Sequence, residues 1–475
     1  MAQPKQKKRS KNRNTLWMLG NPTSKIIYNE IKDLPVYDMH THVNLKLVLD
    51  NNIPPDPWTA LCAGDHYVSS IIESLGTMGR MKFYDNSTAP YDKWTAYAAV
   101  FPKLAGVQVH DWMRLMLQGL GVEEEFNLST AKSIWSVLNK KIQSETYRPV
   151  EIFKRTNIEF MSTTDSPVDN LEQISRAEKF FPKHYWRPAW RPDGIFNIIP
   201  ASLQPRAWMD NIELLEKVSG KSIKGSLNAL KNVLSGRHDF FSENGCRASD
   251  YGMKVPYGHE VSGRRAEDVF IKACKNEPVT KEENADFQAY MLRYSMEMDY
   301  EKGWVSQIHY GPLRNMREVA KQCGGVDSGC DTVGGCPDVA DALRPLLNYF
   351  DTSDGRHHKI CIYTLDKSDW MKIAGLSRIY PSVYAGMSWW YYDSVSGMLE
   401  YFRTVPDAGA GLCKVGPFVT DARNIYSLIP RTEVYRRCLS TVLGEFVEFR
   451  GNSVKSVLDL ARYLCGEHVK GLLGL

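Results

Sequence analysis

The sequence predicts an α/β fold, a (β/α)8 barrel (TIM barrel) with large helical insertions, and three observations support this prediction. Eight short apolar runs are spread along the chain, and most segments between them have the apolar spacing of helices. Strands that alternate with helices pair in parallel, and eight such strands close a barrel. Polar, chemically reactive side chains follow most of the runs, as they do at the carboxyl ends of barrel strands.

The first run is VYDMHTHV at 36–43, in which two histidines stand two residues apart. In a strand such residues point to the same face, so the two imidazoles would lie side by side. The fourth run, NGCRASD, is a poor strand by propensity alone. In chain order, the later runs are IEFMSTTD (158–165), HYWRPAWRPD (184–193), NGCRASD (244–250), GWVSQIHYG (303–311), KICIYTL (359–365), SVYAGMSWW (382–390) and VGPFVTDAR (415–423).

The long segments between the runs are predicted to be helical. TAKSIWSVLNKKI (130–142) and ENADFQAYMLRYSMEM (283–298) have apolar residues at helical spacing, and a last helical region follows Ile429-Pro430. Without the insertions the barrel has the usual length, so we expect a single barrel domain over 15–475. The helical insertions are expected at about 44–155, 200–240 and 255–300.

The positive charge of the chain is concentrated at its start. Six of the 59 basic residues and no acidic residue lie in the first 14 positions, which leaves 53 basic and 55 acidic residues elsewhere. We expect residues 1–14 to form a disordered basic arm in solvent. Such an arm could touch nucleic acid or anionic lipid, but the rest of the chain has no basic stripe to continue the contact. No nucleic-acid partner is therefore expected.

Other classes of protein are excluded by composition. No run of 18 apolar residues is present, so no membrane span is expected, and the basic start lacks the apolar segment of a secretory signal. Ten cysteines in 475 residues are too sparse for a disulfide scaffold, which fits a cytoplasmic protein. The chain has no GxGxxG motif and no P-loop, so neither a nicotinamide nor a nucleotide is indicated.

The residues at the ends of the runs predict a metal site. His40 and His42 from the first strand and Asp421 from the eighth would be close neighbours in a closed barrel, and imidazole and carboxylate ligands suit zinc, manganese or iron. Asp421 alone could instead be a helix N-cap, and two histidines at this spacing also arise by chance. Other polar or aromatic residues at the ends of the runs are Asp165, Arg191, Asp250, His309, Trp389, Trp390 and Arg423.

Several of these residues have structural interpretations as well. Arg191 could pair with Asp193 on a loop instead of binding a substrate. His309 could be a further metal ligand, a sugar contact or a buried histidine with a hydrogen-bond partner. Trp389 and Trp390 are expected to form a wall and part of the core, since aromatic side chains mostly contribute by burial. Outside the runs, the histidines of the polar stretch SDGRHHK (353–359) are expected to be exposed.

With these residues in view, the chain resembles the uronate isomerase (glucuronate isomerase) family, which belongs to the amidohydrolase superfamily of metal-dependent barrels. The similarity runs from about Tyr28 to beyond Arg437. The matching stretches, all in the family's order, are GDHY (64–67), TTDSPVDNL (163–171), WRPD (190–193), GCRASD (245–250), GWVSQIHYGPLRN (303–315), the tryptophan pair at 389–390 and TDARNIYSLIPRTEVYRR (420–437).

The family converts D-glucuronate to D-fructuronate and D-galacturonate to D-tagaturonate, an aldose–ketose isomerisation in hexuronate catabolism. The resemblance therefore implies a barrel of the metal-dependent hydrolase type, a hexuronate substrate and a divalent metal, with zinc as the expected ion. A homo-oligomer is compatible with it. By resemblance, His40, His42 and Asp421 hold the metal, Asp421, Arg423, His66 and Tyr67 act on the reacting carbons, and Arg191, Arg314, His309 and Trp390 contact the sugar acid.

The sequence departs from the family pattern at several positions. Members commonly read HGC and SDH where this chain has Asn244 and Tyr251, and a run of asparagines is replaced by Met316 and Arg317. We expect these departures to lie near the pocket and to bear on substrate preference.

Two other functions fit parts of the sequence. The same barrel could carry a metal-dependent hydrolase or decarboxylase, because a fold does not determine the reaction. A non-catalytic binding protein that uses the basic arm is a third interpretation. The GDHY stretch and the arginines favour the isomerase, since a hydrolase needs a metal-bound water and usually more metal ligands.

Overall fold

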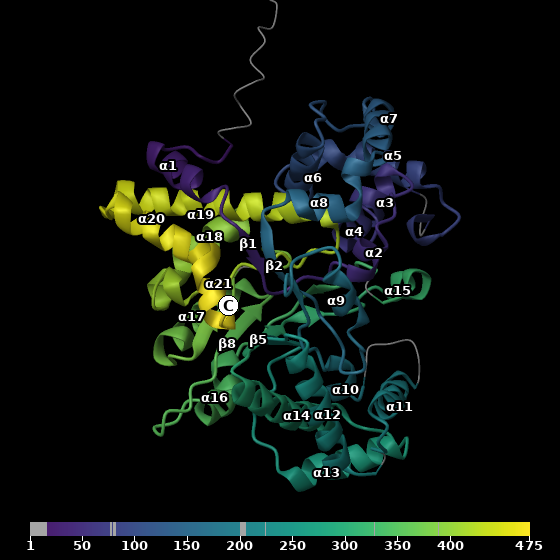
Figure 1. Cartoon of the computed structure of the whole chain (residues 1–475), viewed down its shortest axis with the longest axis vertical. Helices are drawn as coiled ribbons and strands as arrows, with labels where there is room; N and C mark the ends of the chain where they lie inside the picture. Colours follow the sequence, from purple (N-terminus) through teal and green to yellow (C-terminus); the bar gives the residue numbers. More distant parts are fainter. Residues whose placement is uncertain are drawn as a thin grey trace, which may run out of the picture.

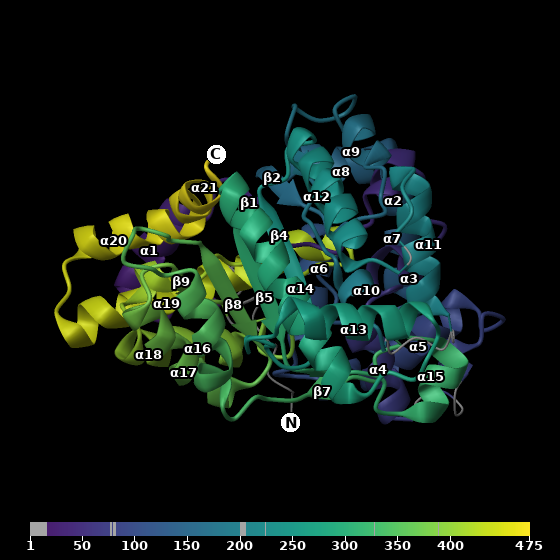
Figure 2. The ribbon, with the colours of Figure 1, turned by 90° about the horizontal axis from the view of Figure 1, so that it is seen from below.

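Parallel strands occupy the centre of the molecule and helices surround them (Figures 1 and 2). The structure is a computed structural model, and it describes residues 17–475 except 77, 79–81, 200–205, 224, 327 and 388. The predicted basic arm at 1–14 lies outside the described residues.

The central strands form two sheets in which neighbouring strands run parallel and follow chain order. A short antiparallel pair, β6 (Pro312–Leu313) with β7 (Thr332–Val333), lies outside them. The first sheet consists of β1 (Val36–Asp38), β2 (Ile158–Ser162) and β3 (Trp186–Arg187), and the second of β4 (Ala248–Met253), β5 (Val305–Tyr310), β8 (Ile360–Thr364) and β9 (Val383–Ala385).

Isolated bridges and backbone hydrogen bonds close the two sheets into a barrel. A parallel bridge from Trp190 to Ser249 joins the first sheet to the second, and a bridge from Ala385 to Val415 leads to the eighth segment. That segment returns to β1, because the Asp421 N–H donates to the His40 carbonyl at 3.2 Å and the His42 N–H donates to the Ala422 carbonyl at 3.0 Å. The predicted (β/α)8 barrel is therefore confirmed, and the eight segments follow in chain order around it.

Each of the first seven predicted runs overlaps a strand, whereas the eighth, VGPFVTDAR, forms only the bridge at Val415. Gly416 and Pro417 follow that bridge, and proline lacks the N–H that a ladder requires. The first strand is assigned only as far as Asp38, but its backbone pairing continues through Thr41, whose N–H donates to Ser162 O at 3.1 Å.

Helices fill the segments that were predicted to be helical. Between β1 and β2 lie α2 (Leu45–Asp50), α3 (Pro57–Leu61), α4 (His66–Ser74), α5 (Pro90–Val100), α6 (Gln108–Gly119), α7 (Ala131–Ile142) and α8 (Pro149–Arg155), after α1 (Pro22–Ile31). The next group is α9 (Glu172–Ala177), α10 (Asp193–Phe196), α11 (Ala207–Ser219), α12 (Leu227–Glu243), α13 (Gly263–Cys274) and α14 (Lys281–Lys302). The last group is α15 (Glu318–Gly324), α16 (Val339–Tyr349), α17 (Trp370–Ile379), α18 (Val395–Ala408), α19 (Leu428–Arg450), α20 (Val454–Arg462) and α21 (His468–Leu473).

Local sequence explains the ends of the longest insertion helix, α14. A capping box begins it: the Thr280 side chain accepts from the Glu283 N–H, and the Glu283 side chain accepts from the Thr280 N–H. Gly303 ends it with a φ of 70°, a conformation that glycine adopts without steric cost. The helices predicted over 130–142 and 283–298 are confirmed as α7 and α14. The division of the chain into one domain over 15–475 stays a prediction.

The long helix α19 packs against α1, α6 and α18 (Figure 1). It begins at Leu428, two residues before Pro430, because a proline in the first turn has no intrahelical hydrogen bond to lose. The expected exposure of the SDGRHHK histidines is wrong for His358, which is buried with its Nε2 2.7 Å from Ser306 Oγ. The side chain of His357 is 54% exposed, as expected.

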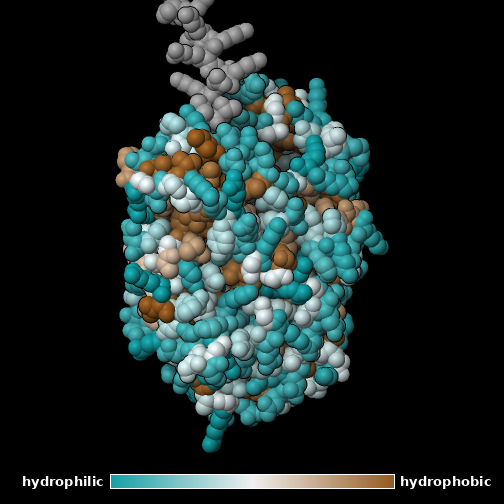
Figure 3. Space-filling model, turned by 60° about the vertical axis from the view of Figure 1, so that its left-hand side comes forward, coloured by the Kyte–Doolittle hydropathy of each residue, from teal (hydrophilic) through white to brown (hydrophobic). Residues whose placement is uncertain are grey.

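The surface on the side of α1, α19 and α20 is mostly hydrophilic, with apolar residues gathered in its upper half (Figure 3). Ile26 of α1 and Phe449 at the end of α19 are exposed by 49% and 84%. Among the described residues, no helix is both long enough and apolar enough to cross a membrane.

Candidate active site and metal centre

Two histidines and one aspartate meet at the carboxyl ends of β1 and the eighth segment. Asp421 Oδ1 lies 3.2 Å from His40 Nε2 and 3.2 Å from His42 Nε2. The two imidazole rings are 4.9 Å apart, edge to face, and the ligand atoms of the three residues lie within 4.8 Å of one another. The proximity predicted from the barrel is confirmed, and the three donors form a group that can hold a divalent metal.

A second carboxylate, Asp250 in β4, lies beside this group. Its Oδ1 is 2.8 Å from His309 Nδ1, and its Oδ2 accepts from Arg191 Nη1 at 2.7 Å and lies 3.6 Å from His40 Nδ1. His40, Asp250 and His309 form a second group with metal-binding geometry. Because His40 belongs to both groups, the five residues make one continuous cluster.

Charge within the cluster decides which groups are ionised. Burial alone would raise the pKa of Asp421, but the hydrogen bonds from His40 and His42 hold it well below its usual range. Asp250 is also buried, and the charges of Arg191, His40 and His309 lower its pKa. Burial lowers the pKa of His42 to about 4, so its ring is neutral at neutral pH. Ionised carboxylates and a neutral imidazole are the forms that bind metal.

Two buried imidazole nitrogens that have no hydrogen-bond partner in the described part of the chain also fit a metal site. His40 Nδ1 and His309 Nε2 are buried and have no hydrogen-bond partner among the described residues. Buried polar atoms are otherwise almost always paired, so such atoms indicate a missing partner. The side chains of His42 and Asp421 are 23% and 16% exposed, which gives the site access to solvent. Imidazole and carboxylate donors at one solvent-accessible point suit a single divalent ion.

Two further side chains fix the orientation of the metal-capable residues. Thr164 Oγ1, just after β2, lies 3.2 Å from His42 Nδ1, so the other ring nitrogen faces Asp421. Trp389 Nε1 donates to Asp421 Oδ2 at 3.0 Å. Asp421 has a φ of 47°, a left-handed conformation that is rare for a residue with a side chain and that clusters at functional sites.

Thr164→Val is expected to weaken metal binding by about 10- to 100-fold, the usual cost of losing a hydrogen bond to a metal-binding histidine. Valine has the shape of threonine but cannot bond to His42 Nδ1, so the ring loses its fixed orientation. A competition titration with a chromophoric chelator measures this affinity.

Thr163→Val is the matched control for this change, because Thr163 Oγ1 donates to Asp165 and not to a histidine. It should leave the metal affinity within about threefold of wild type, well below the loss of about 10- to 100-fold expected for Thr164→Val. Equal losses in both variants would mean that Thr164 does not orient the ligand.

Arg191 lies between two carboxylates at the end of the third segment. Its Nε donates to Asp193 Oδ2 at 3.0 Å and its Nη1 to Asp250 Oδ2, so both the pairing with Asp193 and a place in the site are observed. Gly252 leaves room for this arrangement, since a Cβ there would lie 2.7 Å from Asp193 Oδ2 and 2.8 Å from Arg191 Nη2. The charges of Asp250 and Asp193 raise the pKa of Arg191 despite its burial.

The GDHY stretch begins helix α4, with Asp65 as the N-cap. The His66 ring lies 5.3 Å from the ring of Trp390, and the Tyr67 hydroxyl donates to Asp393 Oδ1 at 3.1 Å. Both residues therefore reach the loop that follows β9, and Trp390 on that loop is buried.

The two remaining predicted arginines are more exposed. The Arg314 guanidinium stacks on Trp390, 4.8 Å from the ring centroid, and its Nη1 donates to Asp331 Oδ2 at 2.7 Å. Arg423 stands two residues beyond Asp421 and is exposed. The structure thus brings Arg314, Trp390 and His66 together, while His40, His42, Asp421, Arg191 and His309 form the cluster around Asp250.

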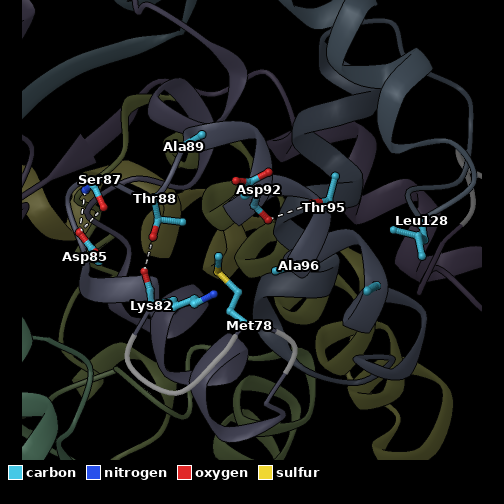
Figure 4. A pocket seen from close by; sticks show the side chains of 11 residues that line it. Met78, Lys82, Asp85, Ser87, Thr88, Ala89, Asp92, Thr95, Ala96 and Leu128 are labelled. Atoms are coloured by element: carbon cyan, nitrogen blue, oxygen red, sulfur yellow. Dashed lines mark hydrogen bonds between the residues drawn. The ribbon is translucent and has the colours of Figure 1, made fainter.

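A separate hollow of about 650 Å³ lies against α5, away from these residues (Figure 4). Its polar groups already serve local turns: Thr88 Oγ1 donates to Lys82 O, Ser87 bonds to Asp85, and Thr95 Oγ1 donates to Asp92 O. Among the described residues, its lining contains one lysine and two aspartates, a charge balance that does not favour an anionic sugar.

Comparison with known proteins gives the family. The family model described as glucuronate isomerase matches residues 10–465 of this chain. A uronate isomerase of Thermotoga maritima is 32% identical over 457 residues, which cover 96% of this chain and 98% of that protein. The chain belongs to the glucuronate isomerase family.

Solved structures agree with this membership in the glucuronate isomerase family. The crystal structure of uronate isomerase from Thermotoga maritima matches with a TM-score of 0.90 and 31% identity, over 96% of this chain and 98% of that one. Glucuronate isomerase from Caulobacter crescentus matches with a TM-score of 0.88 and 26% identity, over 95% and 94%. A putative metal-dependent hydrolase from Lactobacillus casei, at TM-score 0.52 and 11% identity over 94% and 97%, shares the fold alone. The barrel of the metal-dependent hydrolase type is thereby confirmed.

Two departures from the glucuronate isomerase pattern lie away from the pocket, contrary to the expectation from sequence. Side chains alternate along β4, so Asp250 points into the site while Tyr251 points outward. The Tyr251 hydroxyl donates to Asp299 Oδ2 of α14 at 2.7 Å. Asn244 follows the end of α12, where its amide donates to Phe240 O. Met316 is exposed on the loop after β6.

In this member of the glucuronate isomerase family, the roles of three residues at or near the site were not predicted from the sequence. Asp250 was noted only as the end of a run, although it contacts three site residues. Thr164 and Asp393 received no role at all. Thr164 lies within the TTDSPVDNL stretch, whose match to the family was the available signal, whereas nothing in the sequence near Asp393 relates it to Tyr67.

Proposed function

We propose that this protein isomerises a hexuronate, D-glucuronate to D-fructuronate and D-galacturonate to D-tagaturonate, as an aldose–ketose isomerase. The observation that carries the proposal is the convergence of His40, His42 and Asp421 at the carboxyl end of the barrel, in a chain that belongs to the glucuronate isomerase family. An open-chain uronate offers a carbonyl and neighbouring hydroxyls to such a centre.

His40, His42 and Asp421 would hold one divalent ion, and zinc is the ion that we propose. A bound ion of this kind polarises a carbonyl oxygen or orients the oxygens of the sugar. The reaction takes place where Asp421 meets solvent, and we assign it to the cytoplasm.

Proton transfer between carbon 2 and carbon 1 requires a base that is ionised at neutral pH. Asp421 meets this requirement, because its neighbours hold its pKa well below the usual range. Its Oδ2 also accepts a hydrogen bond from Trp389 Nε1, which fixes the direction of the carboxylate. General acid–base catalysis typically contributes about 10²- to 10⁴-fold, and most when the pKa of the group lies near the operating pH.

Arginines near the site suit the charge of the substrate and of the reaction intermediate. Arg191 uses Nε and Nη1 for Asp193 and Asp250, so Nη2 is the nitrogen that we assign to a sugar-acid oxygen. Arg314, stacked on Trp390, is a second candidate for the substrate carboxylate. Arg423, two residues after Asp421, would stabilise the enediolate, while His66 and Tyr67 would line the approach to the reacting carbons.

A metal-dependent hydrolase on the same barrel is the alternative, and only the likeness of fold to the putative hydrolase supports it. No observation favours a binding protein that acts through the basic arm. Whether the chain forms a homo-oligomer is a separate prediction, which light scattering would test.

The test of the proposal is the reaction with both uronates. Purified protein supplied with zinc is expected to form a ketose from D-glucuronate or D-galacturonate in a colorimetric ketose assay. D-glucose, which lacks the carboxylate, is the control substrate and should react far more slowly. In D₂O, solvent deuterium should enter the product at carbon 1, diluted if a shielded base returns the substrate's own proton.

Two results would contradict the proposal. No ketose from either uronate, with metal content verified, would favour the hydrolase. Complete retention of the original hydrogen at every pH and time would favour hydride transfer over an enediol.

A further inference from the structure

A buried aspartate outside the metal-capable cluster joins two distant parts of the chain. Asp393 lies on the loop after β9, and only 7% of it is exposed. Its Oδ1 accepts from the Tyr67 hydroxyl at 3.1 Å, and its Oδ2 accepts from Arg431 Nη1 at 2.9 Å. Tyr67 belongs to α4, in the first insertion, and Arg431 belongs to the C-terminal helix α19. Asp393 is therefore the shared acceptor of two segments more than 350 positions apart in the chain.

Each partner of Asp393 also holds a backbone group next to a site residue. The Tyr67 hydroxyl accepts from the N–H of Tyr391, which directly follows the tryptophan pair. Arg431 Nη1 donates to the carbonyl of Thr420, the residue before Asp421, at 3.0 Å. Arg431 itself is fixed by Trp112, whose ring centroid is 3.7 Å from the guanidinium carbon. The network thus touches the loop that carries Trp389 and the segment that carries Asp421.

The two backbone segments held in this way are both in unfavourable conformations. Tyr391 has a φ of 62° and Asp421 a φ of 47°. Residues with side chains adopt this left-handed region only where their surroundings impose it. The hydrogen bonds to the Tyr391 N–H and to the Thr420 carbonyl hold the two peptide groups on which these φ angles depend. Trp389, between them in space, donates to Asp421 Oδ2 and links the two segments at the site.

We propose that Asp393 is a positioning residue for the isomerase reaction, which holds Tyr67 and Arg431 so that Trp389 and Asp421 keep their places. The inference rests on the proposed function and goes beyond it, because Asp393 is hydrogen-bonded to Tyr67 and Arg431 and, among the described residues, to none of the metal-capable donors. It also gives Tyr67 a task other than proton transfer: its hydroxyl donates to Asp393 and accepts from Tyr391, and burial raises its pKa well above the usual value.

The decisive variant is Asp393→Asn, which keeps the shape of the side chain. An amide keeps one accepting oxygen and replaces the other with a donating NH2 group, so one of the two acceptor positions that Tyr67 and Arg431 use is lost. We expect kcat to fall by about 30- to 100-fold with little change in KM, as for an interaction that acts in the transition state. Zinc affinity should fall by about tenfold, as it does when support of a metal ligand is lost.

Asp369→Asn is the matched control. Asp369 is equally buried and accepts from a tyrosine and a cation: Tyr310 OH at 3.0 Å and Lys372 Nζ at 2.8 Å. It bonds to none of the residues assigned to the site. Asp369→Asn should lower thermal stability about as much as Asp393→Asn does. Its kcat and zinc affinity should stay within about twofold of wild type, below the losses expected for Asp393→Asn.

The pair Tyr67→Phe and Tyr310→Phe repeats the comparison with milder changes, in case Asp393→Asn does not fold. Tyr67→Phe should lower kcat and Tyr310→Phe should not. If Asp393→Asn does fold, the loss in the double variant Tyr67→Phe/Asp393→Asn should be close to that of the worse single variant, because both changes break the same link. Additive losses would mean that Tyr67 acts on the substrate independently of Asp393.

The inference fails if Asp393→Asn and Asp369→Asn have equal kcat and equal zinc affinity. This failure is distinct from a failure of the proposed function, in which wild type forms no ketose. In that case the zinc affinities of the two variants still decide whether Asp393 positions Asp421.

Discussion

Asp421→Asn is expected to lower kcat/KM by about 10³- to 10⁴-fold, the upper part of the range for loss of an acid–base group. Asp421 Oδ1 lies 3.2 Å from both His40 Nε2 and His42 Nε2, so its charge serves both imidazoles at once. Asparagine keeps the shape but loses the negative charge, and its amide nitrogen cannot bind a metal ion or take up a proton. The variant therefore removes a metal ligand and a proton carrier together.

Metal analysis separates these two losses. Zinc content of Asp421→Asn, measured by plasma mass spectrometry, should fall together with activity, whereas the Asp369→Asn control should retain both. If zinc is restored at high concentration and activity stays low, proton transfer is the larger part of the loss. Wild-type activity in the zinc-depleted variant would exclude Asp421 from both roles.

Arg191→Lys is expected to weaken binding of the transition state by about 2–4 kcal/mol, the scale for breaking a desolvated charged contact. This corresponds to a fall of about 30- to 1000-fold in kcat/KM. Arg191 spans two carboxylates with Nε and Nη1, at 3.0 Å from Asp193 and 2.7 Å from Asp250. An ammonium group is a single point of charge and cannot reproduce this fork. Asp250 would lose a partner, and His309 and His40 would lose the fixed carboxylate beside them.

Arg176→Lys provides the matched control in steady-state assays. Arg176 also uses two nitrogens, for Asp50 Oδ1 at 2.8 Å and Leu49 O at 3.0 Å, but it lies between α9 and α2, away from the cluster. Its replacement should cost some stability and leave kcat/KM within about threefold, below the range given for Arg191. Equal kcat/KM values for the two variants would remove Arg191 from the site.

The two predictions test different halves of the site. Asp421 belongs to the group that can hold a metal, and Arg191 belongs to the charge network around Asp250. His40 connects the halves, because its Nε2 faces Asp421 and its Nδ1 lies 3.6 Å from Asp250. A substitution in either half should therefore also disturb the other half. The fall in kcat/KM of the double variant is expected to be smaller than the product of the two single falls.

The sequence by itself determined the barrel and the order of its strands. Eight apolar runs with helices between them leave few topologies other than a parallel closed sheet, because strand and helix periods are local properties. The same logic brought His40, His42 and Asp421 together, since the first and last strands of a closed barrel are neighbours. Gly416 and Pro417 interrupt the eighth run, so no strand is assigned there, but the segment still occupies the eighth position in the barrel.

Only the tertiary structure decided which side chains reach one another across long stretches of chain. Asp393 meets Tyr67 and Arg431 because an insertion and the C-terminal helix fold over the same loop, and no local period relates positions that far apart. His358, in a polar stretch just before β8, is buried because the rings of Tyr300 in α14 and Phe350 after α16 pack against it, beside Ser306. For Tyr251, the alternation of side chains along β4 already directs it away from Asp250. That its hydroxyl meets Asp299 of α14 depends on how the helix packs on the strand. Contacts between distant segments form when the whole chain folds and buries its apolar residues, so a local sequence pattern does not predict them.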